Sequence, residues 1–348
     1  MRFITTLVRV LIWLPLAIGA LILASRAPNR PARAVPEGAR ARFDLVYQSD
    51  RGVALRLDVY EPATAETVAR PRPTAIILHG GSWRGGSRVE MTDWAAAFVA
   101  RGYVAVVPDY TLARPNAPSS DRALDDLRDA VRWTRDHASE FGSDPQRVVA
   151  FGVSAGGHLA ALLGLVSQRL DPAARVQAVV DLYGPSDLVE LLATTPARRD
   201  DLQLFLGSTP RDPSPAALSN ASPRLLVRSN SPPMFLAHGT DDLWVPPEQS
   251  NFLHQALATA RVNHQSLLIP HARHGFGPAI DGRDWTNPLF DFLQSLWDNP
   301  QPRQTPPPTT TLETVTTGTF NEIQKKSTRA LQFSPRLGTI KDVGGHAD

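Results

Sequence analysis

Three residues far apart in the chain carry the side chains that nucleophilic catalysis needs. Ser154 offers a hydroxyl, His274 an imidazole and Asp242 a carboxylate. A serine hydroxyl is a poor nucleophile at neutral pH, so it needs a base to remove its proton, and the base needs a carboxylate to fix its tautomer and stabilise its cationic form. We therefore predict that Ser154, Asp242 and His274 form a catalytic triad.

The segment around Ser154 predicts the sharp turn that exposes a nucleophile. An apolar, β-branched run from Arg147 leads into Gly152-Val-Ser-Ala-Gly156, and a helical pattern of small and apolar residues follows to Val166. Glycines on both sides of the serine leave room for the strand and helix to approach each other. At the helix N-terminus, unpaired backbone N–H groups and the helix dipole favour the negative charge of an acyl-transfer intermediate.

Charge that develops on a substrate carbonyl oxygen needs preorganised donors. The residue after the nucleophile, Ala155, supplies one backbone N–H, and the glycines of His79-Gly-Gly-Ser-Trp83 let the backbone approach the substrate. We predict an oxyanion hole formed by Gly81, Ser82 and Ala155. Trp83 and Trp244 lie beside the predicted catalytic loops, where each either lines the substrate pocket or belongs to the core.

Two predicted catalytic residues have close rivals. His271 is three residues from His274, but Gly275 permits a tight loop that turns the His274 imidazole toward Ser154. Asp241 adjoins Asp242, and we favour Asp242 because the following Val245-Pro246 suggests entry into a helix. A metal pair formed by His271 and His274 lacks further nearby ligands, so we expect no metal.

The remaining pattern predicts an α/β fold with a mostly parallel central sheet, helices on both faces and a small insertion over the active site. Expected strands cover residues 43–47, 54–60, 73–78, 103–110, 147–151, 176–183, 233–237 and 266–269, and expected helices cover 91–101, 119–141, 155–166, 247–261 and 285–297. The less regular residues 189–231 form the expected insertion. Residues 40–298 are predicted to form one catalytic domain, with Asp242 and His274 in loops that follow strands.

Composition excludes several classes of protein. The 348 residues include no cysteine, which excludes disulfides and thiolate metal sites. The formal net charge is only +2, and no dense Lys/Arg stripe interleaves with aromatic residues, so we expect no nucleic-acid partner. With 42% apolar residues the chain has enough material for a large core. Because such a core needs no cofactor to hold the fold together, we expect no cofactor.

Both ends differ from the middle. Residues 1–34 have Arg2 and Arg9, an apolar run from Val10 to Ala24 and a small-x-small site at Ala32-Arg-Ala34, which predicts an export signal and a periplasmic or secreted location. The alternative is an uncleaved anchor that attaches the protein to a membrane. Residues 299–348 are rich in Pro and Thr and are predicted to be a disordered tail.

Several short motifs together resemble the α/β-hydrolase esterase/lipase superfamily. They are His79-Gly-Gly-Ser-Trp83, Asp109-Tyr-Thr-Leu112, Asp144-Pro145, Gly152-Val-Ser-Ala-Gly-Gly157, Asp242 before Val245-Pro246, and His274-Gly-Phe276. Within it, residues 40–298 are similar to secreted carboxylesterases of the feruloyl and acetylxylan esterase type and to hormone-sensitive-lipase-like esterases. The resemblance implies the same triad and oxyanion-hole residues. One departure is Ser82, where many relatives have a third glycine.

The sequence thus predicts a serine hydrolase that cleaves small-molecule or saccharide carboxylic esters through an acyl-serine intermediate. Amide hydrolysis, by an arylformamidase or a peptidase, is an alternative because similar His-Gly-Gly-x-Trp motifs occur in both. A non-catalytic binding protein is the remaining alternative, and it is disfavoured because all three triad residues are present.

Overall fold

The computed structural model describes residues 33–50, 52–63, 71–208 and 211–298. The chain divides into two compact units, residues 1–34 and 35–348. Of the first unit, only Arg33 and Ala34 are described, so the predicted export signal lies outside the described residues except for these two. The predicted tail, 299–348, lies entirely outside them. No helix in the described part of the chain has the length and apolar content to span a bilayer.

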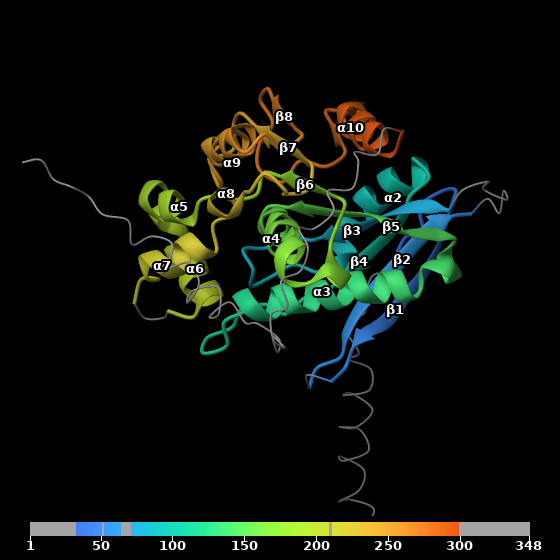
Figure 1. The fold of residues 1–348 in the computed structure, drawn as a ribbon, viewed down its shortest axis with the longest axis horizontal. Helices are drawn as coiled ribbons and strands as arrows, with labels where there is room; N and C mark the ends of the chain where they lie inside the picture. Colours follow the sequence, from blue (N-terminus) through green and yellow to red (C-terminus); the bar gives the residue numbers. More distant parts are fainter. Residues whose placement is uncertain (1–32, 51, 64–70, 209–210, 299–348) are drawn as a thin grey trace, which may run out of the picture. The chain divides into compact units, whose positions relative to one another are not determined.

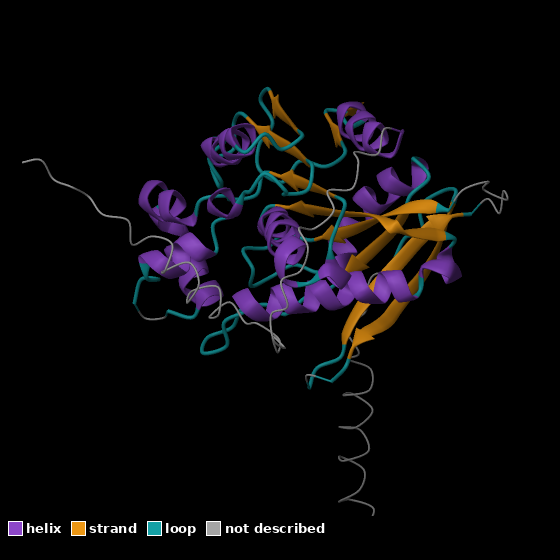
Figure 2. Cartoon of the chain, in the orientation of Figure 1, coloured by secondary structure: helices purple, strands orange, loops and turns teal. Residues whose placement is uncertain are grey.

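An eight-stranded sheet forms the centre of the second unit (Figure 2). Its strands follow the order β1-β2-β4-β3-β5-β6-β7-β8. The strands are β1 (Ala39–Gln48), β2 (Leu55–Pro62), β3 (Arg72–Leu78), β4 (Val104–Pro108), β5 (Ser143–Val153), β6 (Ala178–Leu182), β7 (Met234–Gly239) and β8 (His264–Ile269). β1 and β2 pair antiparallel, as does β2 with β4, whereas all pairs from β4 to β8 are parallel. This confirms the predicted, mostly parallel sheet.

Helices cover both faces of this sheet (Figure 1). On one face, α2 (Thr92–Ala100) and α10 (Asn287–Asp298) pack into a core with Phe151 and Phe235 of the sheet. On the other, α3 (Ser120–Asp136), α4 (Ala155–Leu170) and α9 (Glu248–Thr259) share a second core with Ile76 and Ala150. Alternating strand residues enter the two cores because successive side chains of a strand point to opposite faces.

The connection between β6 and β7 is the predicted insertion. It contains α5 (Leu188–Thr194), the short helix η4 (Pro196–Arg198), α6 (Arg199–Leu206), α7 (Pro215–Asn220) and α8 (Pro223–Leu226). Asp187 caps α5 by accepting hydrogen bonds from the N–H groups of Val189 and Glu190. Leu202 and Phe205 of α6 are fully buried in the core shared with α4. The insertion is therefore packed against the nucleophile's helix.

Two predicted boundaries were wrong. The helix expected at 119–141 ends at Asp136, because the backbone of His137 leaves the helical region with φ of −102° and ψ of 9°, and Ala138–Phe141 continues as the 3₁₀ helix η2 up to the left-handed Gly142. The strand expected from Arg147 begins at Ser143, which pairs with Arg72 across a register shift. A small hairpin, β9 (Ala279–Ile280) and β10 (Arg283–Asp284), was not predicted.

Candidate active site

Ser154 occupies the tight bend between β5 and α4. Its φ of 56° lies in the left-handed region, which side chains rarely adopt. A Cβ on Gly152 would collide with the Gly156 carbonyl oxygen, and one on Gly156 would collide with the carbonyl oxygens of His79 and Leu78. Gly152 is therefore needed for β5 and α4 to pack this closely, as the sequence predicted, and Gly156 is needed for α4 to approach the end of β3.

The structure brings Ser154, His274 and Asp242 into one hydrogen-bonded series. His274 Nε2 lies 2.9 Å from Ser154 Oγ, and His274 Nδ1 lies 2.6 Å from Asp242 Oδ2. The carboxylate accepts, so Nδ1 carries the proton and Nε2 is free to accept the hydrogen of the serine hydroxyl. Asp242 follows β7 and His274 follows β8, and both lie at the carboxyl ends of these parallel strands.

The Asp242 carboxylate is buried and satisfied on both oxygens. Oδ1 accepts the N–H groups of Trp244 and Val245, at 2.8 and 3.0 Å. Burial would raise the pKa of Asp242, but hydrogen bonds from His238 and His274 hold that pKa well below its usual range. Asp242 therefore stays ionised beside His274.

The rival residues lie elsewhere. The His271 side chain is 90% exposed, and its Nδ1 is 3.6 Å from Asp241 Oδ2. Asp241 accepts a hydrogen bond from the Thr240 hydroxyl. Neither rival residue contacts the Ser154–His274 pair within the described part of the chain.

His238 is a second histidine at the site that sequence reasoning missed. It is fully buried at the end of β7, and its Nε2 lies 2.8 Å from the Val245 carbonyl and 3.2 Å from Asp242 Oδ2. Both neighbours only accept, so Nε2 carries a proton that holds the loop bearing Asp242. The available signal was a polar residue at the end of an otherwise apolar strand.

The three predicted oxyanion-hole residues approach each other around Ser154. The loop after β3 lies against the nucleophile, since a Cβ on Gly80 would be 3.2 Å from Ser154 Cβ. In this loop Gly81, Ser82 and Trp83 have φ of 112°, 51° and 59°. Within the described residues, no group accepts a hydrogen bond from the N–H of Gly81, Ser82 or Ala155. Three donors thus remain available to a substrate oxygen.

A cavity of about 490 Å³ opens beside these groups. Ser154, Gly81, Ser82, Ala155 and His274 line it, together with Glu90, Asp93, Leu191 and Arg198. Both predicted tryptophans also line the cavity, but they differ in burial. Trp244 is 56% exposed, with its ring 6.3 Å from that of His274, whereas Trp83 is 3% exposed and belongs to the core. The insertion contributes Arg198, whose guanidinium lies 4.5 Å over the Trp244 ring.

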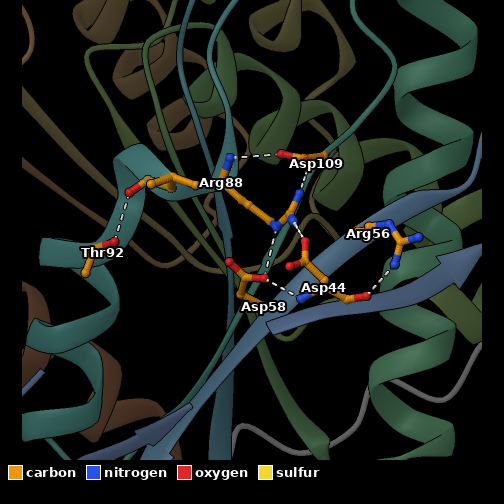
Figure 3. Close-up of polar contacts among 7 residues, drawn as sticks. Asp44, Arg56, Asp58, Arg88, Thr92 and Asp109 are labelled. Carbon is orange, nitrogen blue, oxygen red and sulfur yellow. Dashed lines mark hydrogen bonds and ion pairs between the residues drawn. The ribbon is translucent and has the colours of Figure 1, made fainter. Parts of the chain in front are cut away.

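A buried arginine anchors one wall of the cavity. Figure 3 shows the contacts of this residue, Arg88, with Asp44, Asp58 and Asp109. Arg88 opens η1 (Arg88–Met91), which carries the cavity residues Glu90 and Met91. Its guanidinium pairs with Asp44 of β1, with Asp58 of β2 at 3.0 Å, and with Asp109, which follows β4. Three strands are therefore tied to the segment that forms this wall.

The BD-FAE family profile matches residues 57–257. Among curated proteins, Esterase LipC of Mycobacterium tuberculosis is 32% identical over 239 residues, which is 65% of this chain and 58% of LipC. The chain thus spans just over half the length of that relative. Among solved structures, the propionate-bound form of Est2, a thermophilic esterase from the planctomycete Thermogutta terrifontis, has a TM-score of 0.58 at 29% identity and covers 75% of this chain and 93% of that one.

The same Thermogutta terrifontis esterase phosphorylated by paraoxon has a TM-score of 0.56 at 28% identity, with coverage of 74% of this chain and 92% of that one. The sheet order, the nucleophile turn and these similarities agree with each other. The chain has the α/β-hydrolase fold and belongs to the BD-FAE family.

Proposed function

We propose that this protein is a serine hydrolase that cleaves carboxylic esters through an acyl-serine intermediate. The observation that carries the proposal is the series from Asp242 through His274 to Ser154, which ends beside the N–H groups of Gly81, Ser82 and Ala155, none of which has an acceptor within the described residues. This arrangement combines a nucleophile, its base and an oxyanion hole at one cavity.

In the proposed mechanism, His274 Nε2 removes the hydroxyl proton as Ser154 Oγ attacks the ester carbonyl carbon. The carbonyl oxygen becomes an oxyanion that accepts hydrogen bonds from the backbone of Gly81, Ser82 and Ala155. His274 then protonates the leaving alcohol, which departs as the acyl-serine forms. A water molecule, deprotonated by the same imidazole, attacks the acyl carbonyl carbon. The imidazolium then returns the proton to Ser154 Oγ as the bond to the serine breaks and the carboxylic acid leaves. Asp242 stabilises the imidazolium during both half-reactions.

The relatives support this chemistry and suggest the acyl group. LipC is named an esterase, and the Thermogutta terrifontis esterase is known with propionate bound and in a form phosphorylated by paraoxon. We infer that this chain accepts short acyl groups and is phosphorylated by the same reagent. The exposed Trp244 ring at the cavity offers a flat apolar surface, which suits an alcohol portion that is a saccharide or another small molecule.

The test compares the wild-type protein with Ser154→Ala on 4-nitrophenyl esters of increasing acyl length. We expect the substitution to reduce kcat by at least about 10⁴-fold, because it removes the nucleophile. Ser139→Ala, which changes an exposed serine of η2, is the matched control and should retain full activity. Equal rates for wild type and Ser154→Ala would refute the proposal.

A matching pair of ester and amide substrates tests the reaction class. Faster turnover of the amide would replace ester hydrolysis by amide hydrolysis as the assigned activity. Acetylated and feruloylated saccharides, assayed beside simple alkyl esters, identify the alcohol portion. Paraoxon should add one phosphoryl group to the wild type and none to Ser154→Ala, and intact mass would reveal this difference.

We also infer that residues 1–34 direct the protein to the periplasm or outside the cell. The support is the charged start, the apolar run and the small residues at Ala32 and Ala34. Intact mass of the protein recovered from the exported fraction distinguishes cleavage from membrane anchoring. A chain that retains its first residues and sediments with membranes would favour the anchor.

A further inference from the structure

One buried contact joins the oxyanion-hole loop to the nucleophile's helix. The indole Nε1 of Trp83 lies 3.1 Å from His158 Nδ1, and the two rings meet edge to face at 5.2 Å. Trp83 is 3% exposed and His158 is fully buried. Trp83 directly follows Ser82 of the oxyanion hole, while His158 lies four residues after Ser154, in the first turn of α4.

The partners of His158 determine its tautomer. An indole N–H can only donate, so Nδ1 must be the unprotonated acceptor. The other ring nitrogen, Nε2, lies 2.8 Å from the Ala221 carbonyl oxygen, which can only accept. His158 is therefore the neutral Nε2–H tautomer. Burial lowers the pKa of His158 to about 4, which agrees with a neutral ring at physiological pH.

The loop that Trp83 holds has an unfavourable backbone conformation. Ser82 and Trp83 both have positive φ without being glycine, and such a strained conformation persists only where the surrounding structure imposes it. Around Trp83, the ring stacks on Phe205 at 4.7 Å, the indole N–H bonds to His158, and the carbonyl accepts the Ala113 N–H at 2.8 Å. These contacts fix the residue next to the Ser82 donor.

The insertion also contacts Trp83, His158 and the oxyanion-hole loop. Phe205 of α6 stacks on Trp83 and also meets His158 edge to face, and Ala221, just after α7, accepts the His158 proton. Asp201 of α6 pairs with Arg84 of the same loop at 2.9 Å. One imidazole thus contacts the nucleophile's helix, the oxyanion-hole loop and the insertion.

We propose that His158 and Trp83 are positioning residues that hold the backbone donors of the oxyanion hole in line with Ser154. The proposal rests on the serine-hydrolase function proposed above. Neither side chain needs to touch the reacting atoms for this role. Its signature is a loss of transition-state stabilisation with little change in ground-state binding, because the oxyanion forms only after attack.

The test uses substitutions that remove one contact at a time. Trp83→Phe keeps an aromatic ring for stacking and removes the indole N–H. His158→Gln keeps a donor near the Nε2 position for Ala221 and removes the acceptor, whereas His158→Asn places an oxygen near the Nδ1 position. We expect Trp83→Phe and His158→Gln to lower kcat 10- to 100-fold while KM changes less than about threefold, since a shift of about 1 Å in such a site costs up to 10². His158→Asn should recover most of this loss.

A trifluoromethyl ketone inhibitor, which forms an oxyanion on reaction with serine, gives an independent measure. Its affinity should fall in parallel with kcat/KM in Trp83→Phe and His158→Gln. Trp297→Phe is the matched control, because it removes an indole N–H that donates to the Tyr103 hydroxyl at 2.9 Å, away from the cavity. This control should retain the wild-type kcat and inhibitor affinity.

Failure of the proposed serine-hydrolase function and failure of the positioning role would give different results. A wild type no more active than Ser154→Ala would overturn the proposed function, whereas an active wild type with Trp83→Phe and His158→Gln within threefold of its kcat would overturn the positioning role. Should the variants fail to fold, ¹⁵N NMR of the wild type decides. We expect the Nε2–H tautomer of His158 and a Trp83 indole proton protected from exchange, and the opposite tautomer or an unprotected proton would overturn the proposal.

Discussion

Replacing Asp242 with asparagine should turn His274 Nε2 from a hydrogen-bond acceptor into a donor toward Ser154, while the imidazole ring of His274 is kept. Asp242 Oδ1 accepts two backbone N–H groups, from Trp244 and Val245, so the amide oxygen of an asparagine must occupy the same place. Its NH₂ group then faces His274 Nδ1 and the Nε2–H of His238. His274 can accept this donor only through an unprotonated Nδ1. The proton therefore moves to Nε2, where it points at Ser154 Oγ and blocks deprotonation of the hydroxyl.

The size of the effect follows from this tautomer. In serine hydrolases with a wrongly protonated imidazole, kcat falls by about four orders of magnitude although the geometry is kept. We expect a decrease of 10³- to 10⁴-fold in kcat for Asp242→Asn, which corresponds to about 4–5.5 kcal/mol of lost transition-state stabilisation. KM should change little, because Asp242 is buried behind His274 and does not line the cavity.

Steady-state hydrolysis of 4-nitrophenyl acetate between pH 6 and 9 measures this decrease. Asp241→Asn is the matched control, since it changes the neighbouring, half-exposed carboxylate and should leave kcat unaltered. Far-ultraviolet circular dichroism verifies the fold of both variants. A kcat within tenfold of wild type for Asp242→Asn, or an equal loss in Asp241→Asn, would refute the assigned hydrogen-bond directions.

Three further substitutions test the scaffold and are measured by urea unfolding. Gly152→Ala should destabilise the fold by about 3 kcal/mol, because the added Cβ meets the Gly156 carbonyl oxygen, which is backbone and cannot move aside; a loss below 1 kcal/mol would contradict this packing. Arg88→Met should cost about 3 kcal/mol at pH 7, since it leaves the buried Asp58 without its cation beside two further carboxylates; an unchanged unfolding free energy would count against the cluster. Burial raises the pKa of Asp181 to about 7, so ionising this carboxyl opposes folding as pH rises from about 4 to 7. Asp181→Asn should therefore gain stability relative to wild type over that interval, by at most about 4 kcal/mol, whereas a gain that is the same at pH 4 and pH 8 would exclude this cause.

The sheet and the convergence of the three triad residues were predictable for a shared physical reason. Buried parallel strands appear as short apolar runs, and the carboxyl ends of such strands lie along one edge of the sheet. A serine, an aspartate and a histidine that each follow such a run are thereby brought close together, whatever their separation in sequence. The glycines around Ser154 fixed the bend, because no larger residue allows the strand and helix to approach.

The helix and strand boundaries near residues 137–147 were harder to predict from sequence, because local sequence signals there disagree with the observed structure. Gly142-Ser-Asp-Pro145 has turn composition, yet Ser143 is extended because it pairs with Arg72 of β3. His137 follows an amphipathic helical pattern, but its backbone leaves the helical region and a 3₁₀ turn follows. At Ser143 the deciding contact involves a partner that composition alone does not identify.

Two buried histidines near the site also have partners that the sequence does not identify. His158 reads as an ordinary packing residue, because nothing near it in sequence reveals that Trp83 and Ala221 lie at its two ring nitrogens. His238 stands four residues before Asp242, but only its burial and distances show that it steadies that loop. Reactive groups are recognisable from their chemistry, whereas groups that orient them are ordinary side chains made specific by their partners. Buried histidines whose two nitrogens face segments distant in sequence are therefore the positions at which substitutions should separate positioning from chemistry in this protein.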